Sequence, residues 1–234
     1  MQDWLAAVRV LFLAAITSTL FGCSAFQAGH DQSQDVAEGP NALSIVCSTN
    51  LTPEQQIELD AIDGLMSQSK NFAALARLET LSFSSQQHWL RWSELMGKLD
   101  QTERAEDGFR QIVRACDSAM AYHGLGVIHL KVNRVEEGLE ALYEAKIRDP
   151  GSAVIRNDFG IALMRGALFG QAAFELRTAY ELSGQQMSVA RSMVAAYYLH
   201  GGDVALKKLQ RETGLTEEMI ASGIEFSRQF AVEA

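Results

Sequence analysis

Three cysteines and five histidines are the residues of this 234-residue chain that are considered first for nucleophilic, redox or metal chemistry. The histidines show no His-x3-His pattern, and none stands at the spacing of a zinc site from a cysteine. His123 and His129 are six residues apart on one expected helix, so their side chains do not share a face. We therefore expect no metal site, and we interpret His129 as a packing residue.

The remaining candidate motifs do not predict catalysis. Gly124-Leu-Gly126 resembles a phosphate loop, but a third glycine is missing and no strand is expected before it. The chain has no Gly-x-Ser-x-Gly motif. Paired glutamates at 136–137 and 217–218 fall near expected helix N-termini, where the helix dipole favours carboxylates. We expect neither an enzyme nor a cofactor, and we attribute Gly126 to close helix packing.

Composition points to a folded helical protein that does not bind nucleic acid. Apolar residues make up 47% of the chain, which is enough for a packed core. The formal net charge is −9, whereas phosphate contacts need clustered Lys and Arg. Only three prolines occur, and β-branched residues are sparse beside Ala, Leu, Glu and Gln, which favours helix.

The first cysteine follows an apolar run of 11 residues, Val10 to Leu20. That run is too short for a bilayer core of ~30 Å, which takes about 20 residues, but it fits a secretory signal. The residues from Leu20 to Cys23 resemble the bacterial lipobox, which implies that Cys23 is acylated and that the chain is cut before it. Ser24 then implies sorting to the outer membrane, with the protein facing the periplasm; the alternative is an ordinary helix start with a buried cysteine.

These features predict a lipoprotein signal peptide over residues 1–22, then the lipidated Cys23 and a flexible tether over residues 23–51. Residues 24–50 are mostly polar and hold few large apolar side chains. If Cys23 is lipidated, Cys47 and Cys116 remain in an oxidising compartment and allow a single pairing. They either form a disulfide that fixes the end of the tether to the folded body or stay as two separate thiols.

An internal repeat of about 34 residues follows the tether. Residues 122–126 (YHGLG) align with 156–160 (RNDFG), and the same offset pairs Gly138 with Ala172 and Leu142 with Leu176. A looser copy lies 34 residues further on, with Gly201 and Gly202 at a shortened turn. An upstream copy from Trp89 to Ile112 is one residue out of step.

This pattern resembles the tetratricopeptide repeat (TPR), in which small residues bring the two helices of a hairpin together and proline ends the second helix. The resemblance implies an all-α solenoid of antiparallel helix pairs in a right-handed superhelix. We assign the repeats to residues 52–213 and a C-terminal capping helix to residues 214–234. Helix signals predict helices over 53–68, 71–81 and 217–230, and the first pair is either a degenerate repeat or a cap.

In TPR proteins the first helix of each pair lines a groove, and five positions of each repeat face it. Carried onto this chain, those positions predict a mostly apolar partner-binding groove with cations along it. Such a groove suits an amphipathic helix or an extended apolar segment with an acidic flank. The predicted groove residues are Met120, His123, Val127, Leu130, Lys131, Val154, Asn157, Ile161, Met164, Arg165, Arg191 and Tyr198.

A narrower resemblance lies in residues 156–164 (RNDFGIALM) and 174–182 (FELRTAYEL). They are similar to the TPR lipoproteins of tight-adherence (Flp pilus) systems, the TadD family. This implies a non-enzymatic outer-membrane protein that binds the secretin or another pilus-assembly subunit and assists assembly as a pilotin does. A pilotin for type IV pili and a periplasmic scaffold for peptidoglycan enzymes are the alternatives.

Overall fold

The computed structural model describes residues 42–230, which belong to one compact unit spanning residues 41–234. The predicted signal peptide, Cys23 and the tether up to residue 41 lie outside the described residues. So do the last four residues of the predicted capping helix. Within the described range no helix is long and apolar enough to cross a membrane.

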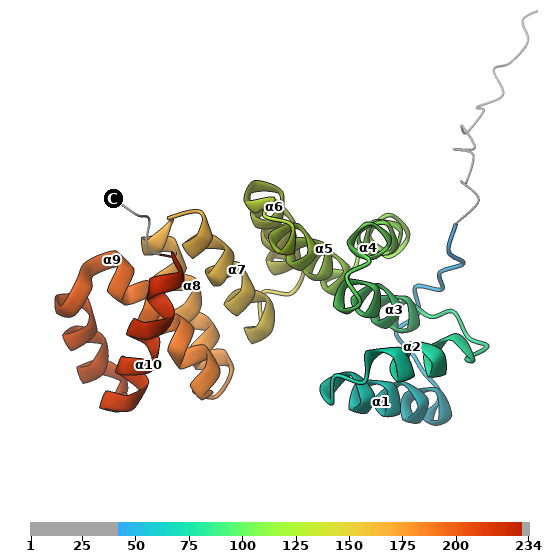
Figure 1. Cartoon of the computed structure of the whole chain (residues 1–234), viewed down its shortest axis with the longest axis horizontal. Helices are drawn as coiled ribbons and strands as arrows, with labels where there is room; N and C mark the ends of the chain where they lie inside the picture. The colour runs from blue at the N-terminus through green and yellow to red at the C-terminus, as the bar shows by residue number, and fades with distance from the viewer. Residues whose placement is uncertain (1–41, 231–234) are drawn as a thin grey trace, which may run out of the picture. The chain divides into compact units, whose positions relative to one another are not determined.

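Helices account for almost all regular structure between residues 42 and 230 (Figure 1). They follow one another with short connections, and each packs on its neighbour in the chain. This confirms the predicted all-α class and its succession of antiparallel pairs. The helices are α1 (Pro53–Ser67), α2 (Asn71–Glu79), α3 (Gln86–Lys98), α4 (Thr102–Cys116), α5 (Ala119–Lys131), α6 (Val135–Arg148), α7 (Ala153–Arg165), α8 (Phe169–Leu182), α9 (Met187–Thr213) and α10 (Glu217–Ser227), with a 3-10 turn η1 (Arg228–Phe230).

The helices repeat with the predicted period. The first helices α3, α5, α7 and α9 begin at residues 86, 119, 153 and 187, which gives steps of 33, 34 and 34 residues. Helix α9 is broken at Gly201 and Gly202, whose backbone angles are non-helical, with φ of 57° at Gly202. The residues after this break serve as the second helix of the last pair, as the predicted turn there requires.

One turn geometry closes the helix pairs. A residue with positive φ follows the first helix, and its N–H donates to the carbonyl three residues earlier. The next N–H donates to the carbonyl five residues back, so carbonyls left open at the helix end are satisfied. The pair α1–α2 shares this geometry, so it is built like the other hairpins. The positive-φ residues are Ser69, Asp100, Asn133 and Ala167.

Capping side chains set the helix starts. Thr52 and Gln55 form the predicted capping box at α1, and Thr216 caps α10 through the N–H of Met219. Three predicted ends shift slightly. Helix α1 stops at Ser67 rather than residue 68, and α2 stops at Glu79 rather than residue 81. Helix α10 stops at Ser227 because its final turn is the 3-10 segment η1.

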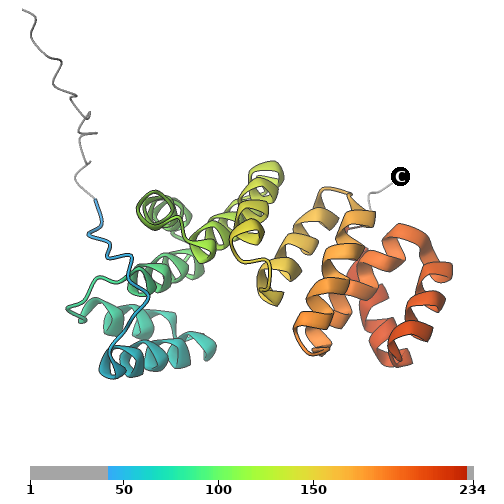
Figure 2. The ribbon, with the colours of Figure 1, turned by 180° about the vertical axis from the view of Figure 1, so that it is seen from behind.

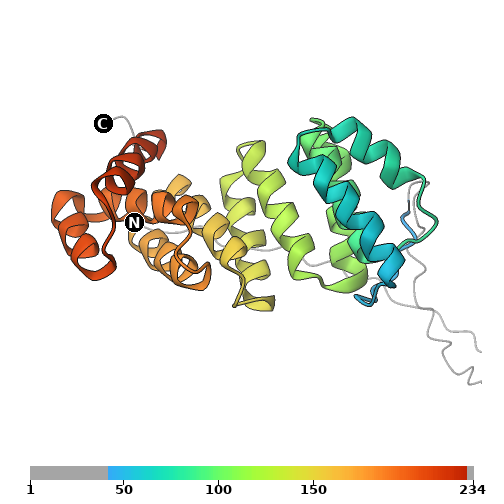
Figure 3. The ribbon, with the colours of Figure 1, turned by 90° about the horizontal axis from the view of Figure 1, so that it is seen from below.

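Glycines allow the two helices of a pair to come into close contact. Figure 3 shows the helix pairs from below. A methyl group on Gly126 would lie 2.6 Å from Leu142 Cγ and 3.1 Å from the carbonyl oxygen of Gly138. On Gly160 it would lie 2.4 Å from Leu176 Cγ. These distances are too short for a side chain, so both positions need glycine for α5 to meet α6 and for α7 to meet α8.

The segment before α1 is attached to the helices rather than free (Figure 2). Val46 donates to the carbonyl of Ser84 and accepts from the N–H of Gln86, both at 2.9 Å. Trp89 Nε1 donates to the carbonyl of Ser44. The tether prediction over residues 23–51 is therefore wrong for its last ten residues, because backbone hydrogen bonding does not depend on their polar side chains. We call residues 42–51 the strap.

A disulfide joins the strap to the end of α4. Cys47 and Cys116 are bonded with an S–S distance of 2.04 Å and a Cα–Cα distance of 5.3 Å. Of the two alternatives for these cysteines, the structure contains the bonded one. The bond encloses a loop with a sequence separation of 69, which includes α1 to α4.

Candidate partner-binding face

The first helices of successive pairs form one continuous surface. Helix α5 touches both α3 and α7, and α7 touches α9. The second helices α4, α6 and α8 do not come into comparable contact with one another. Side chains that leave the first helices on the side away from the second helices therefore share one surface. We call it the first-helix face.

The predicted groove residues divide into three groups by exposure. Met120, Val127 and Val154 are exposed by 46%, 39% and 59%, although all three are apolar. The three predicted cations are also exposed, and the half-buried residues are His123, Asn157, Ile161 and Tyr198. Leu130 and Met164 are buried, with 9% and 0% exposure.

The assignment of Leu130 and Met164 to a partner surface is wrong for this structure. Leu130 packs against Gly138 of the paired helix, and a methyl group added to Gly138 would lie 2.8 Å from Leu130 Cδ2. Met164 belongs to the apolar cluster shared by α7, α8 and α9. Both side chains lie one residue before the end of their helix and fill space between that helix and its neighbours.

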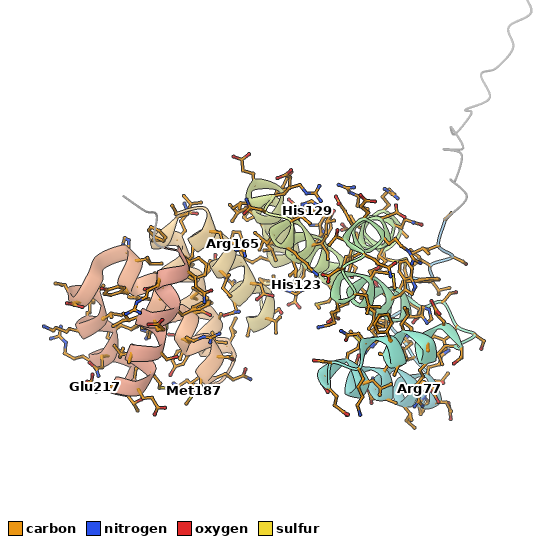
Figure 4. All side chains as sticks on the ribbon, viewed as in Figure 1. Arg77, His123, His129, Arg165, Met187 and Glu217 are labelled. Atoms are coloured by element: carbon orange, nitrogen blue, oxygen red, sulfur yellow. A yellow bond between two sulfur atoms is a disulfide. The ribbon has the colours of Figure 1, made fainter. Side chains whose placement is uncertain are left out.

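A polar group lies among the apolar residues of this face. The Nε2 atom of His123 is 2.7 Å from Asp158 Oδ2, which joins α5 to α7. The Nδ2 of Asn157 donates to the other carboxylate oxygen of Asp158 at 3.1 Å. Figure 4 labels His123 on α5. Sequence reasoning named His123 and Asn157 but missed Asp158, although its separation of 35 from His123 is about one repeat.

Two of the three predicted cations are held by the chain itself. Lys131 Nζ donates to the carbonyl of Gly97 and to Asp100 Oδ1, both at 2.6 Å. One repeat later, Arg165 donates to the carbonyl of Leu130 at 2.5 Å (Figure 4). Each cation sits at the C-terminal end of the preceding first helix, where the helix dipole favours positive charge. These two residues stabilise the stacking of repeats.

The third cation has different surroundings. The guanidinium of Arg191 lies 4.6 Å from the centre of the Phe226 ring, an arrangement that gives a cation–π attraction. No carboxylate in the described residues is within ion-pair distance of Arg191. It borders a pocket of about 350 Å³ whose other walls come from α10 and η1.

His129 is a packing residue, as predicted, and it belongs to a charged joint between repeats. It is buried, and its Nε2 lies 3.2 Å from Glu106 Oε1 of α4. Arg134 donates to the other oxygen of Glu106, and this hydrogen bond is the main reason that the pKa of Glu106 lies below its usual value. No cluster of three potential metal ligands occurs within residues 42–230.

No family model matches the chain. A curated relative, TPR repeat-containing protein PA4299 of Pseudomonas aeruginosa, is 29% identical over 157 residues. The match covers 66% of this chain and 63% of the relative's length. Among solved structures, the thermophilic TPR protein TTC0263 of Thermus thermophilus superposes with a TM-score of 0.57, at 18% identity over 72% of this chain and 98% of that one.

The chain has the TPR fold. A second solved structure, YrrB, described as a TPR protein with an unusual peptide-binding site, superposes with a TM-score of 0.50 at 15% identity. The superposition covers 72% of this chain and 90% of the YrrB chain. In TPR terms the four hairpins α3–α4, α5–α6, α7–α8 and the two parts of α9 are repeats, and α10 continues the stack beyond them.

Proposed function

We propose that this TPR chain is a protein-binding module whose first-helix face holds a segment of a partner protein. The observation that carries the proposal is the exposure of Met120, Val127 and Val154 on neighbouring first helices. Exposed apolar side chains grouped on one surface are typical of an interaction site. An amphipathic helix or an extended apolar segment would cover them.

The polar group among these residues would orient that segment. His123 and Asp158 lie 2.7 Å apart across α5 and α7, so they fix the spacing of two repeats and present polar atoms beside the apolar ones. A peptide backbone laid across this face has donors and acceptors that need partners once water is displaced. The His123–Asp158–Asn157 group is placed to supply them.

We further propose that the chain is an outer-membrane lipoprotein anchored through Cys23, facing the periplasm, and that it assists assembly of a Flp pilus by binding the secretin. The support comes from the lipobox-like residues before Cys23 and from residues 156–164 and 174–182, which are similar to the tight-adherence lipoproteins. The Cys47–Cys116 disulfide also suits an oxidising compartment.

The test is secretin assembly in cells. Val127→Glu with Val154→Glu should abolish co-purification of the secretin and leave helicity unchanged, because two charges would be buried against an apolar segment. Ile147→Glu with Val204→Glu is the matched control, since both residues are exposed and lie on second helices. Deleting the gene should leave secretin multimers unformed or in the inner membrane.

Three results would contradict parts of the proposal. Unchanged secretin capture by the Val127 and Val154 double variant would contradict the first-helix face as the binding surface. Normal secretin multimers in the deletion strain would contradict the pilotin role. Recovery of the wild-type protein in the inner-membrane or soluble periplasmic fraction would contradict anchoring in the outer membrane.

A further inference from the structure

Arg191 stands out among the cations of the first-helix face. Lys131 and Arg165, at the end of their helices, donate to carbonyls of the preceding repeat, and Lys131 also meets Asp100. Arg191 lies in the first turns of α9, and its contact is with the face of the Phe226 ring. Its charge is therefore not neutralised by any described residue.

The pocket beside Arg191 combines an aromatic wall with polar donors. It has a volume of about 350 Å³, and its lining residues are Arg191, Ser222, Glu225, Phe226, Arg228 and Gln229. The hydroxyl of Ser222 and the amide of Gln229 can both donate hydrogen bonds. Such a pocket has room for one large side chain or a chain end.

The charge balance of the pocket favours an anion. Glu225 is paired with Arg228 at 2.6 Å within α10 and η1, so these two charges compensate each other. Arg191 then leaves one net positive charge in the pocket. A guanidinium stacked on an aromatic ring still has its edge N–H groups free, and these suit a carboxylate with two parallel hydrogen bonds.

The two sides of the pocket are held together tightly. A methyl group on Gly223 would lie 2.3 Å from Val194 Cβ and 3.0 Å from the carbonyl oxygen of Arg191. Helix α10 therefore approaches the backbone of α9 as closely as a glycine allows. This contact fixes Phe226 relative to Arg191, so the pocket is formed before any ligand arrives.

We propose that this pocket binds a carboxylate of the partner protein, carried by an acidic residue that flanks the apolar segment on the first-helix face. Arg191 forms the ion pair, Phe226 contacts the neighbouring apolar group, and Ser222 and Gln229 donate to the remaining oxygen atoms. The inference rests on the proposed function and deepens it, because it gives the segment a direction. Its acidic end lies over α9 and α10, and its apolar part lies toward α5 and α7.

The experiment is an NMR titration with N-acetyl-L-phenylalaninate, which joins an aromatic ring to a carboxylate. The protein prepared for this titration consists of residues 24–234, which contain the whole described unit. It is exported from the cell so that the disulfide forms. The carboxylate probe should shift the backbone amides of Ser222, Phe226 and Gln229. N-acetyl-L-phenylalaninamide, the uncharged match, should shift them at least tenfold more weakly, and inorganic phosphate at equal ionic strength should do the same.

Substitutions test whether Arg191, rather than another cation of the first-helix face, binds the carboxylate probe. Arg191→Gln should weaken binding of the carboxylate probe by tenfold or more, and Arg191→Lys should restore part of it. Arg165→Gln is the control, because that cation is held by the chain itself and its loss should leave probe binding within twofold. Thermal melting of each variant, followed by circular dichroism, reports whether the fold is intact.

Several results would overturn the proposal. Equal shifts with the acid and the amide would show that charge does not matter, and unchanged binding by Arg191→Gln would exclude the ion pair. Phosphate binding as strong as the acid would show a general anion site. If removal of residues 231–234 strengthens probe binding tenfold, the chain's own end occupies the pocket instead of a partner. None of these results bears on secretin capture, so failure here is distinct from failure of the proposed function.

Discussion

The two ends of the described repeat stack are closed in different ways. At the N-terminal end the strap is bonded to the turn before α3 through its backbone and to α4 through the Cys47–Cys116 disulfide. At the C-terminal end α10 packs directly on α9 and completes the largest apolar cluster of the described residues. Terminal repeats lack a neighbour that would cover their apolar side. The N-terminal end adds a covalent bond to its packing, and the C-terminal end uses packing alone.

The difference predicts that the N-terminal end depends on redox conditions and the C-terminal end on core volume. The apolar residues of α1 to α4 are split between two smaller clusters, one of which takes in part of α5. Those of α7 to α10 form a single large cluster that also reaches Leu142 of α6 and Leu130 of α5. In a repeat protein each unit contacts only its neighbours, so damage should remain near the altered end. Three measurements can test this contrast.

Removing the disulfide should have the largest effect. With a separation of 69 between the bonded residues, the chain-entropy model assigns the bond about 4 kcal/mol of the free energy of unfolding. Cys47→Ser with Cys116→Ser should lower that free energy by about this amount in urea unfolding. Hydrogen exchange should become faster in α1 to α4, which lie inside the loop.

The control for this prediction is Ser48→Ala, beside Cys47 in the exposed strap, which should change the free energy of unfolding by under about 0.5 kcal/mol. Reducing the wild-type protein should reproduce the effect of the double substitution. If reduction leaves the urea midpoint unchanged, or if exchange speeds up equally in α7 to α10, the contrast between the two ends is wrong.

A cavity in the large cluster should have the next largest effect. Leu176 is fully buried in α8 and packs against Gly160 of α7. Leu176→Ala should cost about 3 kcal/mol in the free energy of unfolding, and hydrogen exchange should become faster mainly in α7 to α10 and not in α1 to α4. Leu182→Ala is the matched control in the same helix, because Leu182 is 47% exposed and its truncation should cost little. Equal exchange rates in α1 and α2 before and after the change would support separate clusters, and a rise there would contradict them.

The parts of the fold that local sequence controls could be predicted. The Thr52–Gln55 capping box, the period of the helices and the glycines at hairpin contacts are each visible within one or two repeats. The Cys47–Cys116 disulfide was one of the two alternatives that the sequence allowed, but the backbone attachment of the strap was missed because its polar composition is typical of a free linker. Its attachment uses backbone groups of Val46 and Ser84, and these carry no sequence signal.

The candidate site was predicted less completely, because its details depend on how one repeat stacks on the next. The sequence places Lys131 and Arg165 on the first-helix face, but their capture by the carbonyls of Gly97 and Leu130 follows from the spacing between repeats. The same stacking turns Met164 inward. Arg191 keeps its charge available because α10, rather than another repeat, follows α9.

The smallest of the three effects concerns the joint between the hairpins α3–α4 and α5–α6, where Glu106 of α4 meets Arg134 at the start of α6 and His129 of α5. The side chain of Glu106 is 12% exposed, and Arg110 also forms an ion pair with it. Glu106→Gln should lower the free energy of unfolding by about 2 kcal/mol at pH 7, since a hydrogen-bonded charge is lost from a mostly buried position. Glu103→Gln in the exposed first turn of α4 should change it by under about 0.5 kcal/mol.

The pH dependence of the Glu106→Gln effect gives this prediction its sharpest form. The hydrogen bond from Arg134 lowers the pKa of Glu106 in the folded protein below its value in the unfolded chain. The unfolded chain therefore binds more protons as the pH falls, and the contribution of Glu106 is complete above an unfolded pKa of about 4.3. The difference in free energy of unfolding between wild type and Glu106→Gln should stay constant from pH 7 to about pH 5 and shrink below that. A difference that stays constant or grows below pH 5 would mean that the charge of Glu106 does not hold α4 against α5 and α6, because protonation would then leave this contribution in place.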